Sequence, residues 1–182
     1  MRIFVVVMVL GHGMHAFAAF ERIASGARGA AMGGSLVALA GNEWCAFVNP
    51  AALRTIEQRT LSLFYAPQPF EMKELAFGAA AYVEPTSIGS FGLAATRWGF
   101  ELYNETRLAL SFAEEFVSGF YAGVNISYNA LSIRNYGSAS TLGVDVGLLM
   151  DVSESVRWGF GALNINAPTI GAAKEKLPQV FT

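Results

Sequence analysis

Histidine and cysteine are almost missing from this chain of 182 residues. Its two histidines, His12 and His15, lie within the first 18 residues, and Cys45 is its only cysteine. A Ser-His-Asp arrangement and a histidine metal site are therefore excluded from residues 19–182, and an intrachain disulfide is excluded as well. We predict that the protein is not an enzyme and has no catalytic residue, metal or cofactor. We interpret Cys45 as a small buried hydrophobic residue.

Charged residues are also scarce. They make up 14% of the chain, whereas hydrophobic residues make up 53%, and ordinary soluble domains contain about a quarter charged residues. Beyond the N-terminus, no apolar run reaches the roughly 18 residues that a membrane-spanning helix needs. A hydrophobic chain without such a helix favours a β-barrel, the other structure that satisfies its backbone in lipid. The formal net charge of −2 indicates no basic surface for nucleic acid.

The N-terminus has the parts of a secretory signal peptide. Arg2 supplies a positive charge, residues 3–10 form an apolar stretch, and Ala16-Phe17-Ala18 is a small-residue cleavage motif. We predict a signal peptide over residues 1–18, removed to leave a mature chain that begins at Ala19. The alternative is a buried N-terminal strand.

Apolar residues alternate with small or polar residues in much of the remaining chain, most clearly over residues 119–130. There the even positions read Phe, Ala, Val, Ile, Tyr, Ala, and the odd positions read Gly, Tyr, Gly, Asn, Ser, Asn. Successive side chains of a strand point to opposite faces, so this segment has one apolar face and one face rich in glycine and amides. Such a pair of faces is typical of a barrel wall, with the small face toward a crowded lumen and the apolar face toward lipid.

We predict antiparallel strands at residues 60–66, 74–83, 88–98, 105–113, 119–130, 141–150 and 155–164, joined by turns. Most approach the roughly 9 to 11 residues that cross a membrane at a tilt. Turns are predicted at residues 67–69 and 84–87, and a polar loop at residues 136–140. Aromatic residues near strand ends indicate interfacial girdles, although aromatics favour strands in any case; they are Tyr65, Tyr82, Trp98, Tyr103, Tyr128 and Trp158.

Residues 19–58 lack the period of two and form a separate N-terminal segment. Asn49-Pro50-Ala51 indicates the start of a helical turn, with Asn49 as its N-cap and Pro50 at the first helical position. The glycines of residues 26–34 lack the Gly-Lys-Ser/Thr ending of a phosphate-binding loop. We interpret them as sites of tight packing against a wall formed by the strands of residues 59–182.

A few charged and amide residues fall in strands on faces made of small residues. Asp145 lies between Gly143 and Gly147 on one face of the predicted strand 141–150. Arg107, Asn125 and Arg157 occupy faces of the same kind on their own strands. We predict that these four residues face the lumen, because an aspartate that faces lipid is costly. Either the charged residues pair with one another or with the N-terminal segment, where Arg28 is a candidate partner of Asp145, or they are solvated in a water-filled lumen. A further alternative places Arg107 and Arg157 near strand ends at the membrane interface.

The N-terminal segment resembles a known family. Residues 26–40, which read GARGAAMGGSLVALA, and the following Asn49-Pro50-Ala51 are similar to the PorV/PorQ group of outer-membrane proteins, related to the FadL family of hydrophobic-compound channels. Residues 162–168 and 175–178 resemble the junction where such proteins begin their next strand. The resemblance implies that residues 19–58 form a hatch inside the barrel, with a hatch motif made of Arg28, Met32, Gly33, Gly34, Asn49, Pro50 and Ala51.

The resemblance also implies a barrel of about fourteen antiparallel strands, within the usual size range of such barrels. Seven strands make about half of that barrel. We therefore expect the chain to be the N-terminal fragment of a longer protein, and the alternative is a half-barrel that assembles with copies of itself. The expected location is the outer membrane of a Gram-negative-type bacterium.

The leading expectation for function is passive transport of hydrophobic compounds across the outer membrane. The alternative is a PorV-like, non-enzymatic component of a type IX protein secretion system. A third class is a soluble secreted β-sandwich. The expected partners are outer-membrane lipid and either hydrophobic small molecules or secretion-system proteins, with no nucleic acid.

Overall fold

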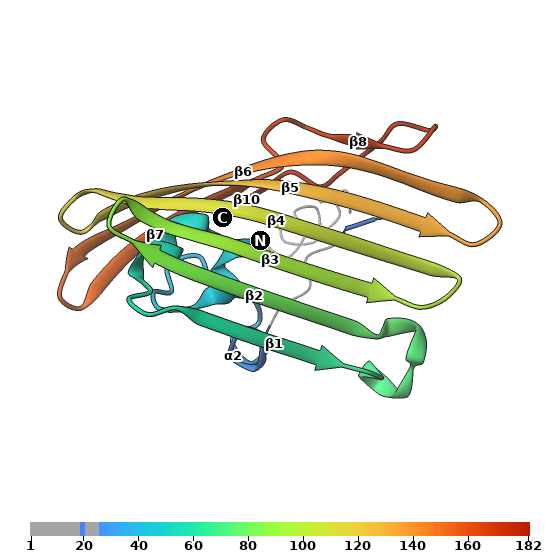
Figure 1. The fold of residues 1–182 in the computed structure, drawn as a ribbon, viewed down its shortest axis with the longest axis horizontal. Coiled ribbons are helices and arrows are strands. Elements are labelled where there is room, and N and C mark those ends of the chain that lie inside the picture. Colours follow the sequence, from blue (N-terminus) through green and yellow to red (C-terminus); the bar gives the residue numbers. More distant parts are fainter. Residues whose placement is uncertain (1–18, 21–25) are drawn as a thin grey trace, which may run out of the picture.

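The computed structural model describes residues 19–20 and 26–182, so the predicted signal peptide lies outside the described residues. Eight strands form one antiparallel sheet in the order β1-β2-β3-β4-β5-β6-β7-β10 (Figure 1). They are β1 (Thr60–Ala66), β2 (Phe77–Thr86), β3 (Gly89–Gly99), β4 (Tyr103–Val117), β5 (Phe120–Ile133), β6 (Gly137–Ser153), β7 (Val156–Leu163) and β10 (Val180–Phe181). A separate hairpin pairs β8 (Thr169–Ile170) with β9 (Glu175–Lys176).

The helices of the described residues are short. Those that precede β1 are α2 (Ala27–Ala31), η1 (Glu43–Phe47) and η2 (Pro50–Thr55). Two more, η3 (Pro69–Glu71) and η4 (Lys73–Leu75), connect β1 to β2. Within the described ranges, no helix has the length and apolar character needed to cross a membrane.

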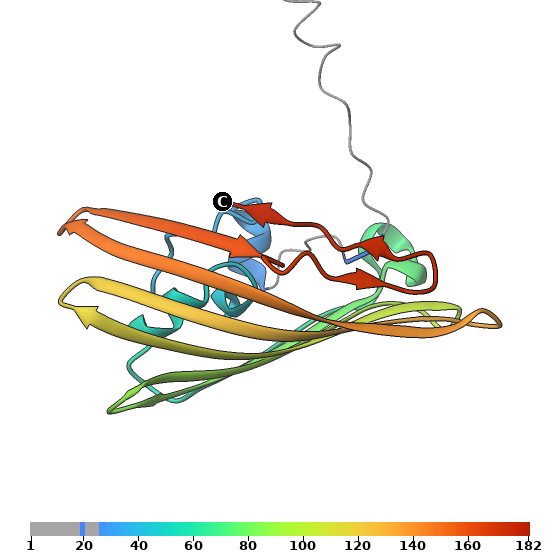
Figure 2. The same ribbon diagram turned by 90° about the horizontal axis from the view of Figure 1, so that it is seen from above.

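One face of the sheet is covered by the N-terminal helices and the β8–β9 hairpin (Figure 2). Figure 2 shows the strands curving around the N-terminal helices, with the β8–β9 hairpin on the same side. Helices η1 and η2 contact strands β2 to β6 from this side. We call this side of the sheet the covered face and the opposite side the outer face.

The hydrophobic core lies between the N-terminal helices and the covered face. The helices contribute large side chains, including Trp44, Phe47 and Leu53, and the strands contribute mainly small ones, including Ala81, Ala94 and Ala109. Because alanine and glycine leave room above the strands, the backbone of η2 lies close to the sheet.

The outer face carries large apolar side chains that are exposed. Leu93, Leu110, Ile126 and Val144 are direct cross-strand neighbours on four successive strands. The first three are 57%, 54% and 52% exposed. From β3 to β7, most large apolar side chains therefore point outward and most small or polar side chains lie on the covered face, while exceptions such as Leu149 and Trp98 pack against the core.

Strand β2 reverses this pattern, which the sequence does not predict. The apolar residues on one face of β2 are buried against the core, and they are Phe77, Ala79, Ala81 and Val83. Its glycine, alanine and tyrosine are cross-strand neighbours of Tyr65, Leu63 and Leu61 on the outer face. The physical reason is the position of β2 beside η1, because the bulky side chains of η1 require apolar partners on this strand.

Several predicted boundaries are wrong. Strand β1 has the predicted bounds, but residues 137–140, predicted as a loop, pair with β5. Residues 84–86, predicted as a turn, continue β2, and Pro85 pairs with Ser90 of β3. Residues 73–75 form η4, so β2 begins later than predicted. The β2–β3 and β5–β6 hairpins extend into residues of loop-like composition because the neighbouring strand supplies backbone partners there.

Two of the predicted girdle aromatics lie on the covered face. Trp98 packs against the core, and its ring centroid lies 5.7 Å from that of Tyr103. Tyr65, Tyr128 and Trp158 are exposed on the outer face. The girdle interpretation is therefore wrong for Trp98 and Tyr103.

The sheet is open among the described residues. Strands β1 and β10 form its two edges, and neither pairs with the other. Edge strands present backbone N–H and C=O groups that have no partner within the sheet. The prediction of an antiparallel sheet is confirmed, and closure into a barrel stays a prediction.

Candidate functional site

The Asn49-Pro50-Ala51 motif attaches the N-terminal segment to the sheet. Asn49 is fully buried, and its side-chain Nδ2 donates to the carbonyl of Leu148 on β6 at 2.9 Å and to that of Val37 at 2.6 Å. Its Oδ1 accepts from the Ala51 N–H at 3.2 Å, which makes it the N-cap of η2. The predicted cap and the predicted place of Pro50 are confirmed, and the helix is a 3₁₀-helix.

Strand glycines make this close approach possible. A Cβ at Gly147 would overlap the Asn49 amide oxygen, and a Cβ at Gly123 would lie 2.5 Å from the Ala51 nitrogen. Similar overlaps with the N-terminal segment would occur at Gly159 and Gly161. The glycines of the covered face therefore form the seat of the hatch motif.

The remaining residues of the predicted hatch motif do not belong to this seat. Arg28 and Met32 are exposed, and Gly33 and Gly34 adopt positive φ values of 60° and 81° in the turn after α2. A Cβ at Gly33 would meet open space. These two glycines serve a left-handed turn, so the interpretation of tight packing against the strands is wrong for Gly33.

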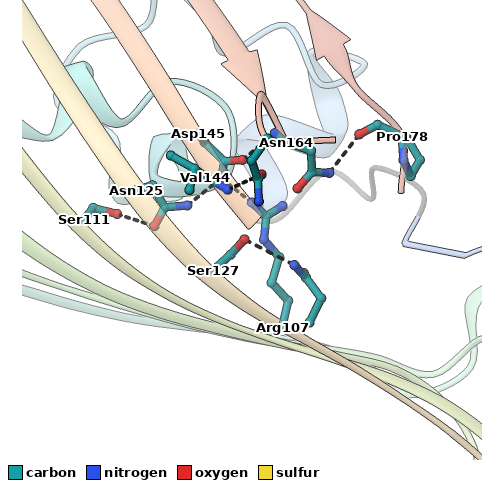
Figure 3. A network of polar contacts seen from close by, with 10 residues as sticks. Arg107, Ser111, Asn125, Ser127, Val144, Asp145, Asn164 and Pro178 are labelled. Carbon is teal, nitrogen blue, oxygen red and sulfur yellow. Dashed lines mark hydrogen bonds and ion pairs between the residues drawn. The ribbon is translucent and has the colours of Figure 1, made fainter. Parts of the chain in front are cut away.

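A buried polar network lies on the covered face, with Asp145 at its centre (Figure 3). Asp145 is fully buried. Its Oδ2 pairs with Arg107 Nη2 at 2.5 Å and accepts from Asn125 Nδ2 at 2.6 Å. Its Oδ1 accepts from the backbone N–H of Asn164 at 2.8 Å. The predicted residues Arg107, Asn125 and Asp145 thus come together from three adjacent strands.

Arg107 links this network to the N-terminal segment. Its guanidinium carbon lies 5.8 Å from the ring centroid of Phe47 on η1, within the range of a cation–π contact. On the other side of the network, Ser111 Oγ contacts Asn125 Oδ1 at 3.2 Å. The network therefore joins the wall of strands, the N-terminal segment and the chain after β7.

Two predicted residues lie apart from the network. Arg157 forms an ion pair with Asp151 in the β6–β7 hairpin, and both side chains are about one-third exposed. Arg28 is exposed on α2, and the carboxylate of Asp145 is bound by Arg107, Asn125 and Asn164.

Sequence reasoning missed Asn164. Its Nδ2 donates to the Pro178 carbonyl at 2.8 Å, while its backbone N–H binds Asp145, so it holds both ends of the connection that contains β8 and β9. The sequence marked it only as the last residue of a predicted strand and as part of residues 162–168, which resemble a strand junction of the related family. A contact with a residue 19 positions earlier depends on strand register and cannot be read from local sequence.

Cys45 is predicted to be unreactive in the folded protein. It is fully buried, and its thiol donates to the carbonyl of Leu39 at 3.3 Å. Burial is the main cause that raises the pKa of the Cys45 thiol to about 12, and the negative charge of Glu43 adds to it. Because the thiolate is the reactive form, we expect negligible alkylation by iodoacetamide at pH 8 and full alkylation in denaturant. Rapid alkylation under native conditions would contradict the packing of η1.

Comparisons of this chain with protein-family models, with curated proteins and with solved structures found no match.

Proposed function

We propose that this chain is part of the wall of an outer-membrane β-barrel that lets hydrophobic compounds pass by a passive route. The observation that carries the proposal is the contrast between the two faces of the sheet. The outer face exposes leucine, isoleucine and aromatic side chains on successive strands, and soluble monomers rarely expose apolar patches larger than a few hundred Å². Contact with lipid accounts for such a face.

Strand length supports the same proposal. Strands β3 to β6 contain 11, 15, 14 and 17 residues, and about 9 to 11 residues suffice to cross the hydrocarbon core at a tilt. The outer face also has a hollow of about 450 Å³ lined by apolar side chains, among them Leu93, Leu110 and Ile126. This hollow suits a lipid acyl chain.

The N-terminal segment supports a route along the covered face. Its contacts with the strands are mostly apolar, and Asn49 provides a direct hydrogen bond to β6. Movement of such a hatch would expose an apolar surface beside the sheet, as a hydrophobic substrate requires. The proposal agrees with the resemblance to FadL-related channels.

Flux through reconstituted protein tests the transport proposal. Liposomes that contain the protein should take up a fluorescent long-chain fatty acid faster than empty liposomes, and a hydrophilic dye should stay outside. The variant Asn49→Ala should change the fatty-acid rate several-fold, because it removes the hydrogen bond to β6. Uptake no faster than in empty liposomes would reject transport. Co-purification with secretion proteins in that case would favour the PorV-like alternative.

A charge on the outer face tests the membrane proposal separately. We expect Leu110→Arg to reduce membrane insertion strongly, because an arginine at the bilayer midplane costs about 2–4 kcal/mol. Ser118→Arg is the matched control, because Ser118 lies in the exposed β4–β5 turn. The measurement is the fraction of protein that stays in washed membranes. Equal retention of the two variants, or release of the unmodified protein without detergent, would contradict the proposal.

A further inference from the structure

The apolar hollow on the outer face extends to the edge strand β1. It has a volume of about 450 Å³, and its lining includes Leu61 and Tyr82, which are direct neighbours on β1 and β2. The rest of the lining comes from strands β2 to β6 and includes Leu108 and Tyr128. Among the described residues that line the hollow, none is charged. The hollow therefore offers a surface that accepts a hydrocarbon chain.

An ion pair is linked to this hollow through Tyr82. The Tyr82 hydroxyl donates to Glu84 Oε2. The same carboxylate accepts from Arg59 Nε at 2.7 Å and from Arg59 Nη2 at 2.8 Å. The side chain of Arg59 is 71% exposed and that of Glu84 is 32% exposed. One end of the hollow thus carries an accessible cation and an accessible anion.

The ion pair keeps hydrogen-bonding positions of both kinds open. A guanidinium has five N–H donors, and a carboxylate has about four acceptor positions. Glu84 takes two of these donors, and Arg59 and Tyr82 together take three of the acceptor positions. Within the part of the chain that the structure describes, about three donors of Arg59 and about one acceptor position of Glu84 remain. A ligand that matches them has an anionic group and a cationic N–H group side by side.

We propose that the hollow and the Arg59–Glu84 pair form a binding site for a phospholipid with a primary ammonium in its headgroup, namely phosphatidylethanolamine. An acyl chain lies in the hollow, the phosphate accepts from Arg59, and the ammonium donates to Glu84. Charged side chains are costly at hydrocarbon depth, so this pair belongs at the level of the headgroups. This inference rests on the proposal that the outer face meets lipid, and it is independent of transport.

The same chemistry predicts which other phospholipids bind less well. The quaternary ammonium of phosphatidylcholine has no N–H to donate to Glu84. The glycerol headgroup of phosphatidylglycerol has no cation, so its phosphate meets Arg59 while the charge of Glu84 repels it. Both lipids have the same acyl chains available for the hollow, so the headgroup alone separates them from phosphatidylethanolamine.

Competition among these three lipids tests the site. Purified protein in a mild detergent is mixed with equal amounts of the three lipids carrying identical acyl chains. Native mass spectrometry then measures the fraction of protein that retains one lipid of each class. We expect phosphatidylethanolamine to exceed each of the other two by up to about fivefold, the ratio that one exposed charged contact provides.

Two variants of the ion pair separate the headgroup contacts. Glu84→Gln should bring the ratio of phosphatidylethanolamine to phosphatidylcholine close to one, because it removes the charge that binds the ammonium. Arg59→Gln should lower the retention of all three lipids, because it removes the donors to phosphate. Arg134→Gln is the matched control, since it breaks the exposed pair of Arg134 with Glu101, away from the lining of the hollow, and it should change neither quantity.

A variant of the hollow tests the acyl-chain contact. Ala95→Phe fills part of the hollow, so it should lower the retention of all three lipids and leave their ratio unchanged. Protection of Cys45 from alkylation reports whether each variant is folded. Equal retention of the three lipids by the unmodified protein, or an unchanged ratio in folded Glu84→Gln, would overturn the lipid site while the membrane proposal stands. Release of the unmodified protein from membranes without detergent would overturn both.

Discussion

Gly147→Val is expected to detach the hatch motif from the sheet. The new Cβ would overlap the Asn49 amide oxygen and lie 2.8 Å from Pro50 Cδ, so Asn49 would lose its hydrogen bond to the Leu148 carbonyl. Valine favours strands more than glycine does, so the strand itself gains from the change and the expected loss arises at the hatch. Overpacking of a well-packed core typically costs about 1–3 kcal/mol.

Cys45 serves as the reporter for this prediction. Cys45 lies on η1, adjacent to η2, and is fully buried in the unmodified protein. We expect Gly147→Val to make it reactive toward a maleimide under native conditions. Gly78→Val is the matched control, because a Cβ there would lie 3.7 Å from Tyr65 Cδ2, an ordinary contact. Full protection of Cys45 in Gly147→Val would show that the hatch motif tolerates the lost space.

Asp145→Ala is expected to destabilise the protein strongly. It leaves Arg107, whose side chain is 16% exposed, beside Phe47 without its carboxylate. Removing one partner of a buried ion pair costs about 3–5 kcal/mol, because the remaining charge is uncompensated. Asn125 and the backbone of Asn164 also lose their acceptor.

The exposed pair in the β6–β7 hairpin provides the comparison. Asp151→Ala removes a partner of Arg157 where both side chains are about one-third exposed, and exposed pairs contribute about 0–1 kcal/mol. Urea unfolding in detergent, followed by the change in gel mobility, measures both variants. The double variant Arg107→Leu/Asp145→Leu should recover part of the stability, because it buries no unpaired charge. Equal midpoints for Asp145→Ala and Asp151→Ala would refute the central role of Asp145.

Local sequence determines which side chains share a face of each strand. The alternation over residues 119–130 and 141–150 needs only the period of a strand, and in both segments the small and polar residues occur on the covered face. The cap at Asn49 is equally local, since it depends on residues two positions apart. For these reasons, the antiparallel sheet and the start of η2 could be predicted.

Tertiary structure decides what each face meets. The charged partner of Asp145 is Arg107, 38 positions away in the sequence, and strand register and sheet curvature bring the two together. The reversed faces of β2 follow from the position of η1, and the strand character of residues 137–140 follows from pairing with β5. The local sequence by itself determined the alternating faces of the strands and the N-cap at Asn49, because both depend on residues only a few positions apart. Only the folded sheet could select the contacts of Asp145, Asn164 and Asn49, because those contacts depend on how distant strands and helices are placed in space.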